Sequence, residues 1–187
     1  MSEPIVRLTG KKVDLCILMT DPEFVELYTK WYNDETIGMW VHGNDGVHSI
    51  AESQEWADNA NKDGHYNFTV CVKRTYKGKV KHTPIGTCSI GCYGNSRNAS
   101  LGILLGEQQS KGYGTEVIAM LIKFAFEEMN AHRLELNVCA DNERAIRCYT
   151  KNGFKECGRK HEAGYFGGKY RDVIQMEILE QDYKKGL

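Results

Sequence analysis

A glycine-containing stretch between a predicted strand and a predicted helix has the residue types of a phosphate-binding loop. Residues 109–115 read Gln-Ser-Lys-Gly-Tyr-Gly-Thr. The N-terminus of a helix presents unpaired N–H groups and a partial positive charge, and glycines let the backbone approach an anion closely. Lys111 would add a cation beside the phosphates. We therefore expect this loop to bind a phosphate-bearing ligand, with an ordinary glycine turn as the alternative.

Two other phosphate-binding motifs do not match this stretch. A P-loop requires Gly-Lys-Ser/Thr at its second glycine, whereas Gly114 is followed by Thr115 and Glu116. A dinucleotide-binding fingerprint requires a third small residue where Val117 stands. The spacing therefore excludes both of these nucleotide-binding motifs.

A second stretch places a tyrosine on one face of a predicted helix, together with an asparagine and a small residue. Ala145 follows Asn142 by three residues and Tyr149 follows it by seven. The three residues therefore lie on one face of the predicted helix over 141–152. A tyrosine hydroxyl can protonate a leaving group. Taken alone, Tyr149 also fits a half-buried core residue, so the second motif gains its meaning only together with the first.

The elements that position these motifs follow from hydrophobic periodicity and capping residues. We predict helices over 22–31, 49–61, 114–130 and 141–152, and strands over 13–18, 66–74, 85–93, 99–105, 133–138, 154–160 and 173–179. Residues 33–48 are polar, with three glycines, and are predicted as a long loop of the kind that often carries function. The order predicts one mixed α/β (α+β) domain over 1–187, with about seven strands and about four helices.

Composition excludes several classes of function. The chain has 24 Lys and Arg against 25 Asp and Glu, so we expect no nucleic-acid or membrane partner. No apolar run approaches the roughly 20 residues of a membrane span, and the first residues are unlike a signal peptide. Seven cysteines without a Cys-x-x-Cys pair favour neither a disulfide framework nor a metal site. A reduced, cytoplasmic setting fits best.

The two motifs together, about thirty residues apart in this order, resemble the GNAT superfamily of N-acetyltransferases. The family pattern is Gln/Arg-x-x-Gly-x-Gly/Ala, then a helix and a strand, then Asn-x-x-Ala-x-x-x-Tyr-x-x-x-Gly-Phe, and residues 109–114 and 142–154 fit it. The resemblance covers residues 85–154. Residues 165–176 and 31–34 are also similar to the ribosomal-protein (RimJ/RimL-like) branch of N-acetyltransferases.

The resemblance implies acetyl-coenzyme A as co-substrate, with no metal. It also implies a GNAT-like sheet in which strand 99–105 splays from the next parallel strand and admits the pantetheine arm. The loop amides would hold the pyrophosphate, Asn142 would bind the cofactor, Ala145 would leave room for it, and Tyr149 would protonate the departing thiolate. The cofactor contacts so implied are Ile103, Leu104, Leu105, Gln109, Lys111, Gly112, Tyr113, Gly114, Thr115, Asn142, Ala145 and Tyr149.

The reaction implied is direct attack by a neutral primary amine, so some group must take a proton. Many relatives carry a glutamate in the strand before the loop, where this chain has Ser100. The base therefore stays open among water and the side chains Glu52, Glu55, Glu116, Glu135, His42 and His48. No cysteine is marked as an activated nucleophile.

The acceptor amine also stays open. A protein N-terminus, a polyamine and an amino sugar or aminoglycoside all fit, and a propionyl donor competes with acetyl. The predicted substrate residues are Trp31, Asn33, Asp34, Trp40 and Ser100. The alternative is a non-catalytic acetyl-coenzyme A-binding sensor or interaction protein, which the serine at position 100 keeps open. Family habit suggests a homodimer.

Overall fold

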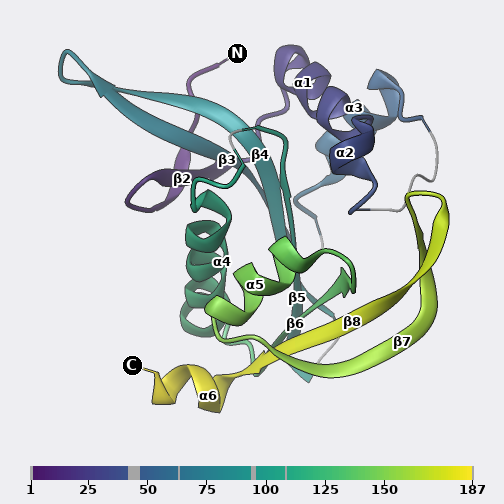
Figure 1. Cartoon of the computed structure of the whole chain (residues 1–187). Coiled ribbons are helices and arrows are strands. Elements are labelled where there is room, and N and C mark those ends of the chain that lie inside the picture. The colour runs from purple at the N-terminus through teal and green to yellow at the C-terminus, as the bar shows by residue number, and fades with distance from the viewer. Residues whose placement is uncertain (1, 42–46, 63, 94–95, 108, 187) are drawn as a thin grey trace.

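One mixed sheet of eight strands organises the protein, in the order β1-β2-β3-β4-β5-β6-β8-β7. We describe residues 2–41, 47–62, 64–93, 96–107 and 109–186 in a computed structural model (Figure 1). The strands are β1 Val6–Thr9, β2 Val13–Ile17, β3 His65–Tyr76, β4 Lys79–Tyr93, β5 Asn98–Leu105, β6 Arg133–Cys139, β7 Lys155–Phe166 and β8 Lys169–Leu179. The predicted mixed α/β class is confirmed.

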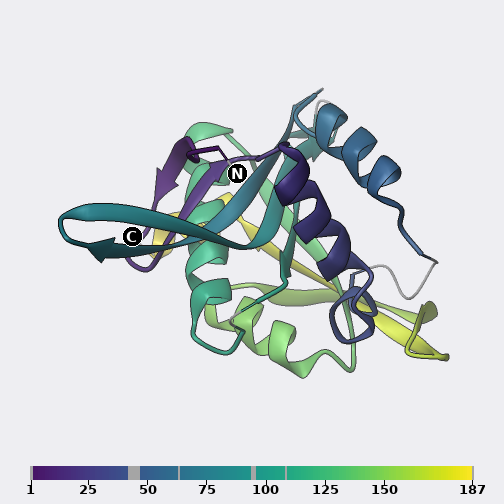
Figure 2. The same cartoon turned by 90° about the horizontal axis from the view of Figure 1, so that it is seen from above.

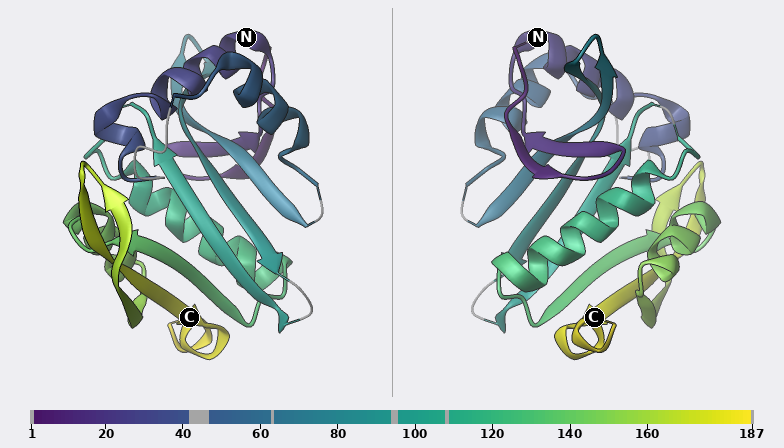
Figure 3. Two further views of the ribbon diagram at one scale, coloured as in Figure 1. Left: turned by 90° about the vertical axis from the view of Figure 1, so that its right-hand side faces the viewer. Right: turned by 90° about the vertical axis from the view of Figure 1, so that its left-hand side faces the viewer.

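Helices cover both faces of this sheet. They are α1 Pro22–Tyr32, α2 Glu35–Gly38, α3 Ile50–Asn59, α4 Tyr113–Lys123, α5 Glu143–Lys151 and α6 Glu180–Lys185, and a π-helical segment, Phe124–Glu128, continues α4. Figure 3 shows α4 and α5 on one face and α1 and α3 on the other. The sheet therefore separates two layers that can carry different parts of a site.

The predicted helix starts are confirmed by their caps. Asp21 accepts a hydrogen bond from the Phe24 amide, and Pro22 takes the first helical position. Ser49 and Glu52 form a capping box at the start of α3. Asn142 caps α5 by accepting from the Ala145 amide.

Two hairpins are longer than their apolar runs suggested. The β3–β4 hairpin turns at Lys77–Gly78 and extends beyond the rest of the sheet, as Figure 2 shows from above. The β7–β8 hairpin turns at Gly167 and Gly168, with φ of 55° and 79°. Its tip reaches α2, because a Cβ at Gly167 would lie 2.9 Å from the Met39 methyl carbon.

Four short elements correct the sequence-based description. Strand β1 was not predicted, because it has only four residues, most of them exposed, with no buried face to set a period. Helix α2 lies inside the predicted loop, α6 follows β8, and the helix predicted over 114–130 changes to a π-helix after Lys123. Each is too short or too irregular for periodicity to detect.

Strand β5 is paired differently along its two edges. It pairs with β4 along its whole length, from Tyr93 opposite Asn98 to Gly86 opposite Leu105. With β6 it pairs in parallel over only three residues, Asn98 to Ser100. Beyond Ser100 the two strands separate, which confirms the predicted splayed pair.

The hydrophobic interior forms two clusters. The larger lies between the sheet and α4, where Val117, Ile118 and Leu121 are fully buried. The smaller joins Phe24 and Trp31 of α1 to the other face of the sheet. The larger cluster therefore fixes α4 on the sheet, while the smaller one fixes the α1–α3 layer.

Candidate active site

A cavity of about 340 Å³ opens where β5 and β6 separate. The ends of both strands, the loop before α4, one side of α5 and the α2 segment line it. The lining residues are Ile37, Trp40, Val41, Ile103, Leu104, Leu105, Gln109, Ser110, Gly112, Gly114, Thr115, Asn137, Val138, Asn142, Arg144, Ala145, Arg147, Cys148, Tyr149 and Lys151. The structure thus brings both sequence motifs to one cavity.

The glycine loop begins α4 with its amide groups directed out of the helix. Gly112 is the N-cap and has a left-handed backbone with φ of 82°, which a glycine adopts without strain. It has no side chain to cap the first amides of α4, so these remain available to an anion. Lys111 and Tyr113 belong to the same loop and helix start but do not line the cavity.

Gln109 ties the loop to its neighbours. Its amide nitrogen donates to the Leu105 carbonyl at 2.8 Å, and Arg144 donates to its amide oxygen. These contacts connect the end of β5, the loop and α5. The position expected to contact the cofactor therefore also holds the loop in place.

Tyr149 lies at the inner wall of the cavity. Its side chain is 8% exposed and its ring meets Phe154 edge-on, with centroids 6.0 Å apart. Burial, together with the neighbouring Cys148, raises the pKa of Tyr149 above its ordinary value, so the hydroxyl is protonated at neutral pH. A buried, protonated hydroxyl on a cavity wall has the properties of a general acid.

Several cavity residues were not predicted from the sequence. Arg144, Arg147 and Lys151 line one side of the cavity from α5. Their spacing of three and four residues puts them on one helix face, a signal that was available in the sequence. These cations give the cavity a positive wall suited to a phosphorylated ligand.

Cys148 also lines the cavity, where it is partly buried. Burial raises the pKa of the Cys148 thiol, which keeps it protonated. Its sulfur lies 3.6 Å from the Thr115 hydroxyl and so connects α5 to α4. The thiol therefore serves packing between the two helices.

Two of the predicted substrate residues have structural partners. Trp31 is 3% exposed and packs on Gly106 so tightly that a Cβ there would overlap its ring. Asn33 donates to the His48 carbonyl and accepts from the His48 amide, both at 2.8 Å. The Trp31 ring is therefore enclosed by the smaller core cluster.

Asp34 and Trp40 lie at opposite ends of α2. Asp34 caps the helix by accepting from the Thr36 amide at 2.9 Å, and bonds from the Thr36 side chain and amide lower its pKa. Trp40, just past the C-terminal end, lines the cavity together with Ile37. Residues 31–34 thus anchor the segment that presents Trp40.

Ser100 lies away from this cavity. It lines a second hollow with Ser89 and His65, on the β3–β4–β5 surface next to α3. In the sheet it faces Glu135 of β6, whose carboxylate is 3.0 Å from Arg133. Ser100 therefore has an acid opposite it on the adjacent strand.

Two other candidate bases have structural bonds. Glu52 belongs to the capping box of α3. Glu116 accepts from the Lys12 amide at 2.8 Å. His42 lies outside the described residues. Neither Glu52 nor Glu116 lines the cavity, so the geometry assigns neither of them to it as a base.

Family comparison identifies the class of protein. The acetyltransferase (GNAT) domain family matches residues 7–155, which is most of the chain. The chain belongs to this family.

Individual relatives refine that result. A spermidine N(1)-acetyltransferase from Vibrio cholerae is 33% identical over 88 residues, which is 46% of this chain and 51% of the relative. The chain therefore matches about half the length of that relative. An uncharacterized N-acetyltransferase, p20, from Bacillus licheniformis is 25% identical over 186 residues, covering 95% of each chain.

A solved structure shows the same fold. The spermidine N-acetyltransferase from Vibrio cholerae in complex with CoA and spermine has a TM-score of 0.77 at 22% identity. The match covers 94% of this chain and 99% of that chain.

Two further observations bear on ligands and location. Among the described residues, no group of three or more His, Cys, Asp or Glu side chains is placed to hold a metal ion. Within the same part of the chain, no helix has the length and apolarity needed to cross a membrane.

Proposed function

We propose that this protein transfers an acetyl group from acetyl-coenzyme A to a primary amine. The observation that carries the proposal is the cavity between β5 and β6, which brings together a glycine loop, a free strand edge and the buried Tyr149. Each of these three features matches one part of the donor molecule. The family membership of the chain supports the same activity.

The donor would lie along the separated strands. Pantetheine contains two amide groups, and β5 beyond Ser100 has a backbone edge that β6 does not pair. The backbone groups of residues 103–105 would hydrogen-bond to the amides of this arm, which would extend the sheet as in strand addition. The pyrophosphate would then reach the amides at Gly112 and the first turn of α4.

The chemistry needs one proton donor and one proton acceptor. The amine nitrogen attacks the thioester carbonyl, forming a C–N bond as the C–S bond breaks, and the Tyr149 hydroxyl gives its proton to the departing thiolate. A backbone amide of β5 would stabilise negative charge on the carbonyl oxygen. The amine proton leaves through water, which also restores the proton of Tyr149.

The acceptor would approach from the side of α2. The exposed carboxylates of Asp34 and Glu35 lie at the start of this helix, and Ile37 and Trp40 of the cavity lie toward its other end. Hydrogen bonds from Thr36 lower the pKa of Asp34, so it is charged at neutral pH. A segment that carries both acids and an aromatic side chain suits a cationic amine. Together with the spermidine-acetylating relative, this favours a polyamine over a protein N-terminus or an amino sugar.

The direct test is release of free thiol from acetyl-coenzyme A with a panel of amines. The panel contains spermidine, an aminoglycoside, and peptides with Ala or Ser at the N-terminus. We expect release with spermidine, and release with another class alone would replace the polyamine assignment. A non-catalytic sensor, the reading that Ser100 keeps open, would bind acetyl-coenzyme A in calorimetry without turnover of any amine. Absence of binding would remove the cofactor site itself.

A further inference from the structure

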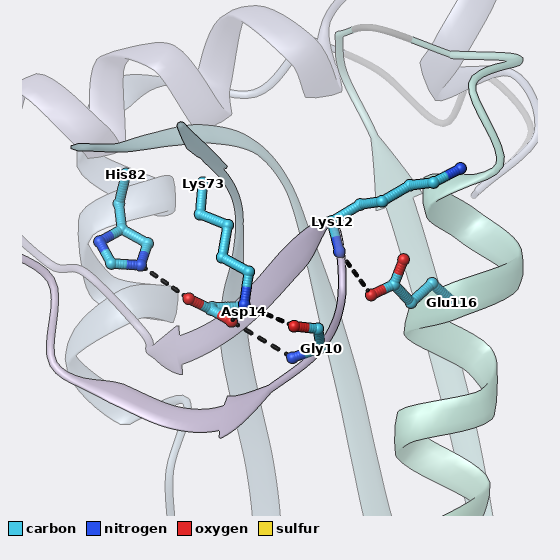
Figure 4. A network of polar contacts seen from close by, with 6 residues as sticks. All are labelled: Gly10, Lys12, Asp14, Lys73, His82 and Glu116. Atoms are coloured by element: carbon cyan, nitrogen blue, oxygen red, sulfur yellow. Dashed lines mark hydrogen bonds and ion pairs between the residues drawn. The ribbon is translucent and has the colours of Figure 1, made fainter. Parts of the chain in front are cut away.

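The turn between β1 and β2 lies against the glycine loop, although about a hundred residues separate them in the chain. The Lys12 amide donates to the Glu116 carboxylate of α4 at 2.8 Å, and the Lys12 carbonyl accepts from the Lys73 amide of β3 at 3.3 Å. The backbone of Lys12 is therefore held between α4 and β3, as Figure 4 shows in part.

The Lys12 side chain reaches the start of α4. Its ammonium nitrogen is 3.5 Å from the Lys111 carbonyl oxygen and 3.7 Å from where a Cβ at Gly112 would lie. Gly112 is the loop residue at which we place the pyrophosphate, and Lys111 directly precedes it. An anion bound to the loop amides would therefore lie within reach of this solvent-exposed cation.

A buried carboxylate fixes the turn that carries Lys12. Asp14 is 4% exposed and accepts from the Gly10 amide at 3.2 Å and from the Lys73 ammonium at 3.0 Å. Its other oxygen lies 2.8 Å from the His82 ring nitrogen Nε2, and Lys73 also donates to the Gly10 carbonyl. Figure 4 shows these contacts converging on Asp14.

The charge of Asp14 is compensated where it lies. Burial acts to raise the pKa of this carboxyl, but the bonds from His82 and Lys73 outweigh it and lower the pKa. A buried carboxylate with this many partners is costly to leave half-paired, so the arrangement is stiff. The turn therefore has little freedom to move Lys12 away from the loop.

We propose that Lys12 binds the pyrophosphate of coenzyme A and that Asp14 is the positioning residue that holds Lys12 at the loop. This inference rests on the proposed function. It adds a residue from the N-terminal hairpin to a site otherwise built from β5, α4 and α5.

The first test measures binding by calorimetry with two ligands, coenzyme A and 3′-dephospho-coenzyme A. We expect Lys12→Ala to weaken both by about five- to tenfold, since both ligands contain the pyrophosphate and an ion-assisted contact of this size is ordinary. The difference in affinity between Lys12→Ala and the unaltered protein should shrink in high salt, because the contact is exposed. Lys11→Ala is the matched control, an exposed lysine of the same turn.

The outcomes separate this inference from the proposed function. Loss of affinity for coenzyme A alone would move Lys12 to the ribose 3′-phosphate and overturn the pyrophosphate contact. If Lys12→Ala and Lys11→Ala bind each ligand with equal affinity, the proposed contact of Lys12 with the pyrophosphate is also overturned, even if both variants keep full activity. Failure of the unaltered protein to bind coenzyme A would instead reject the proposed function.

The second test addresses Asp14. We expect Asp14→Asn to raise the KM for acetyl-coenzyme A by a similar factor with little change in kcat, and to have no further effect on that KM in a Lys12→Ala background. Additive effects would show that Asp14 acts on the site without Lys12. If Asp14→Asn does not fold by circular dichroism, Glu116→Ala replaces it. Glu116→Ala removes the hydrogen bond between the Lys12 amide and α4. Adding it to Lys12→Ala should also leave the KM for acetyl-coenzyme A unchanged.

Discussion

The cofactor side and the acceptor side of the cavity are built in different ways. On the cofactor side, α4 and α5 pack on the larger core, and the groups we assign to the donor are mostly backbone amides at fixed turns. On the acceptor side, the four-residue helix α2 and the residues just after it present side chains to the cavity, and Asp34 caps the start of this helix. A ligand site built from backbone amides needs glycines at particular spacings, so the sequence contains a recognisable motif. A site built from side chains on a short segment has no such motif.

This contrast makes separate predictions for the two substrates. A change on the cofactor side should alter donor binding or thiolate departure. A change on the acceptor side should alter mainly the constants of the amine.

The largest effect is expected for Gly112→Asp. Its φ of 82° strains any side chain, and a carboxylate there would repel the pyrophosphate, so affinity for coenzyme A should fall by about 100-fold or more. Calorimetry measures this directly. Gly78→Asp is the control, because Gly78 has a similar φ of 75° with nothing near its Cβ position. Unchanged affinity in Gly112→Asp would show that the phosphates bind elsewhere.

Tyr149→Phe should lower kcat by about 100-fold while affinity for coenzyme A changes by less than about twofold, since only the proton donor is lost. Because burial raises the pKa of Tyr149, its proton is retained further into the alkaline range than that of an ordinary tyrosine, near pH 10. The kcat of the unaltered protein should therefore show no loss from this group below about pH 10.

The control for this prediction is Tyr183→Phe, which removes a hydroxyl bonded to Glu127 at 2.7 Å, outside the cavity. Equal kcat values for the two variants would remove Tyr149 from its role. A fall in kcat near pH 8 that disappears in Tyr149→Phe would contradict the raised pKa.

A smaller effect is expected for Trp40→Ala on the acceptor side. Losing an aromatic wall should raise the KM of the amine by about five- to tenfold and change the KM of acetyl-coenzyme A by less than about twofold. Steady-state kinetics with both substrates varied gives the two constants. Trp40→Phe should recover most of the loss. A larger change in the donor constant would place Trp40 on the cofactor side and weaken the contrast.

The sequence predicted the cofactor side of the cavity better than the acceptor side. Capping residues and periodic apolar positions located the main helices and strands, and the two motifs pointed to Gly112 and Tyr149, which share the cavity. Helix α2 was missed because four residues contain no period, and the burial of Trp31 was missed because its partner, Gly106, is distant in the chain. Lys12 was missed for a related reason: its place beside the loop depends on the tertiary fold.

The unequal pairing of β5 has a consequence for hydrogen exchange. Successive amides of a strand point to opposite edges, so beyond Ser100 half of the β5 amides face β4 and half face the space left by β6. In the free protein, the first set should be protected from deuterium and the second set should exchange readily. When a donor molecule occupies the cavity, protection should appear at alternate residues along one strand. Protection that appears at every second amide of β5 would report occupancy of the site without any measurement of turnover.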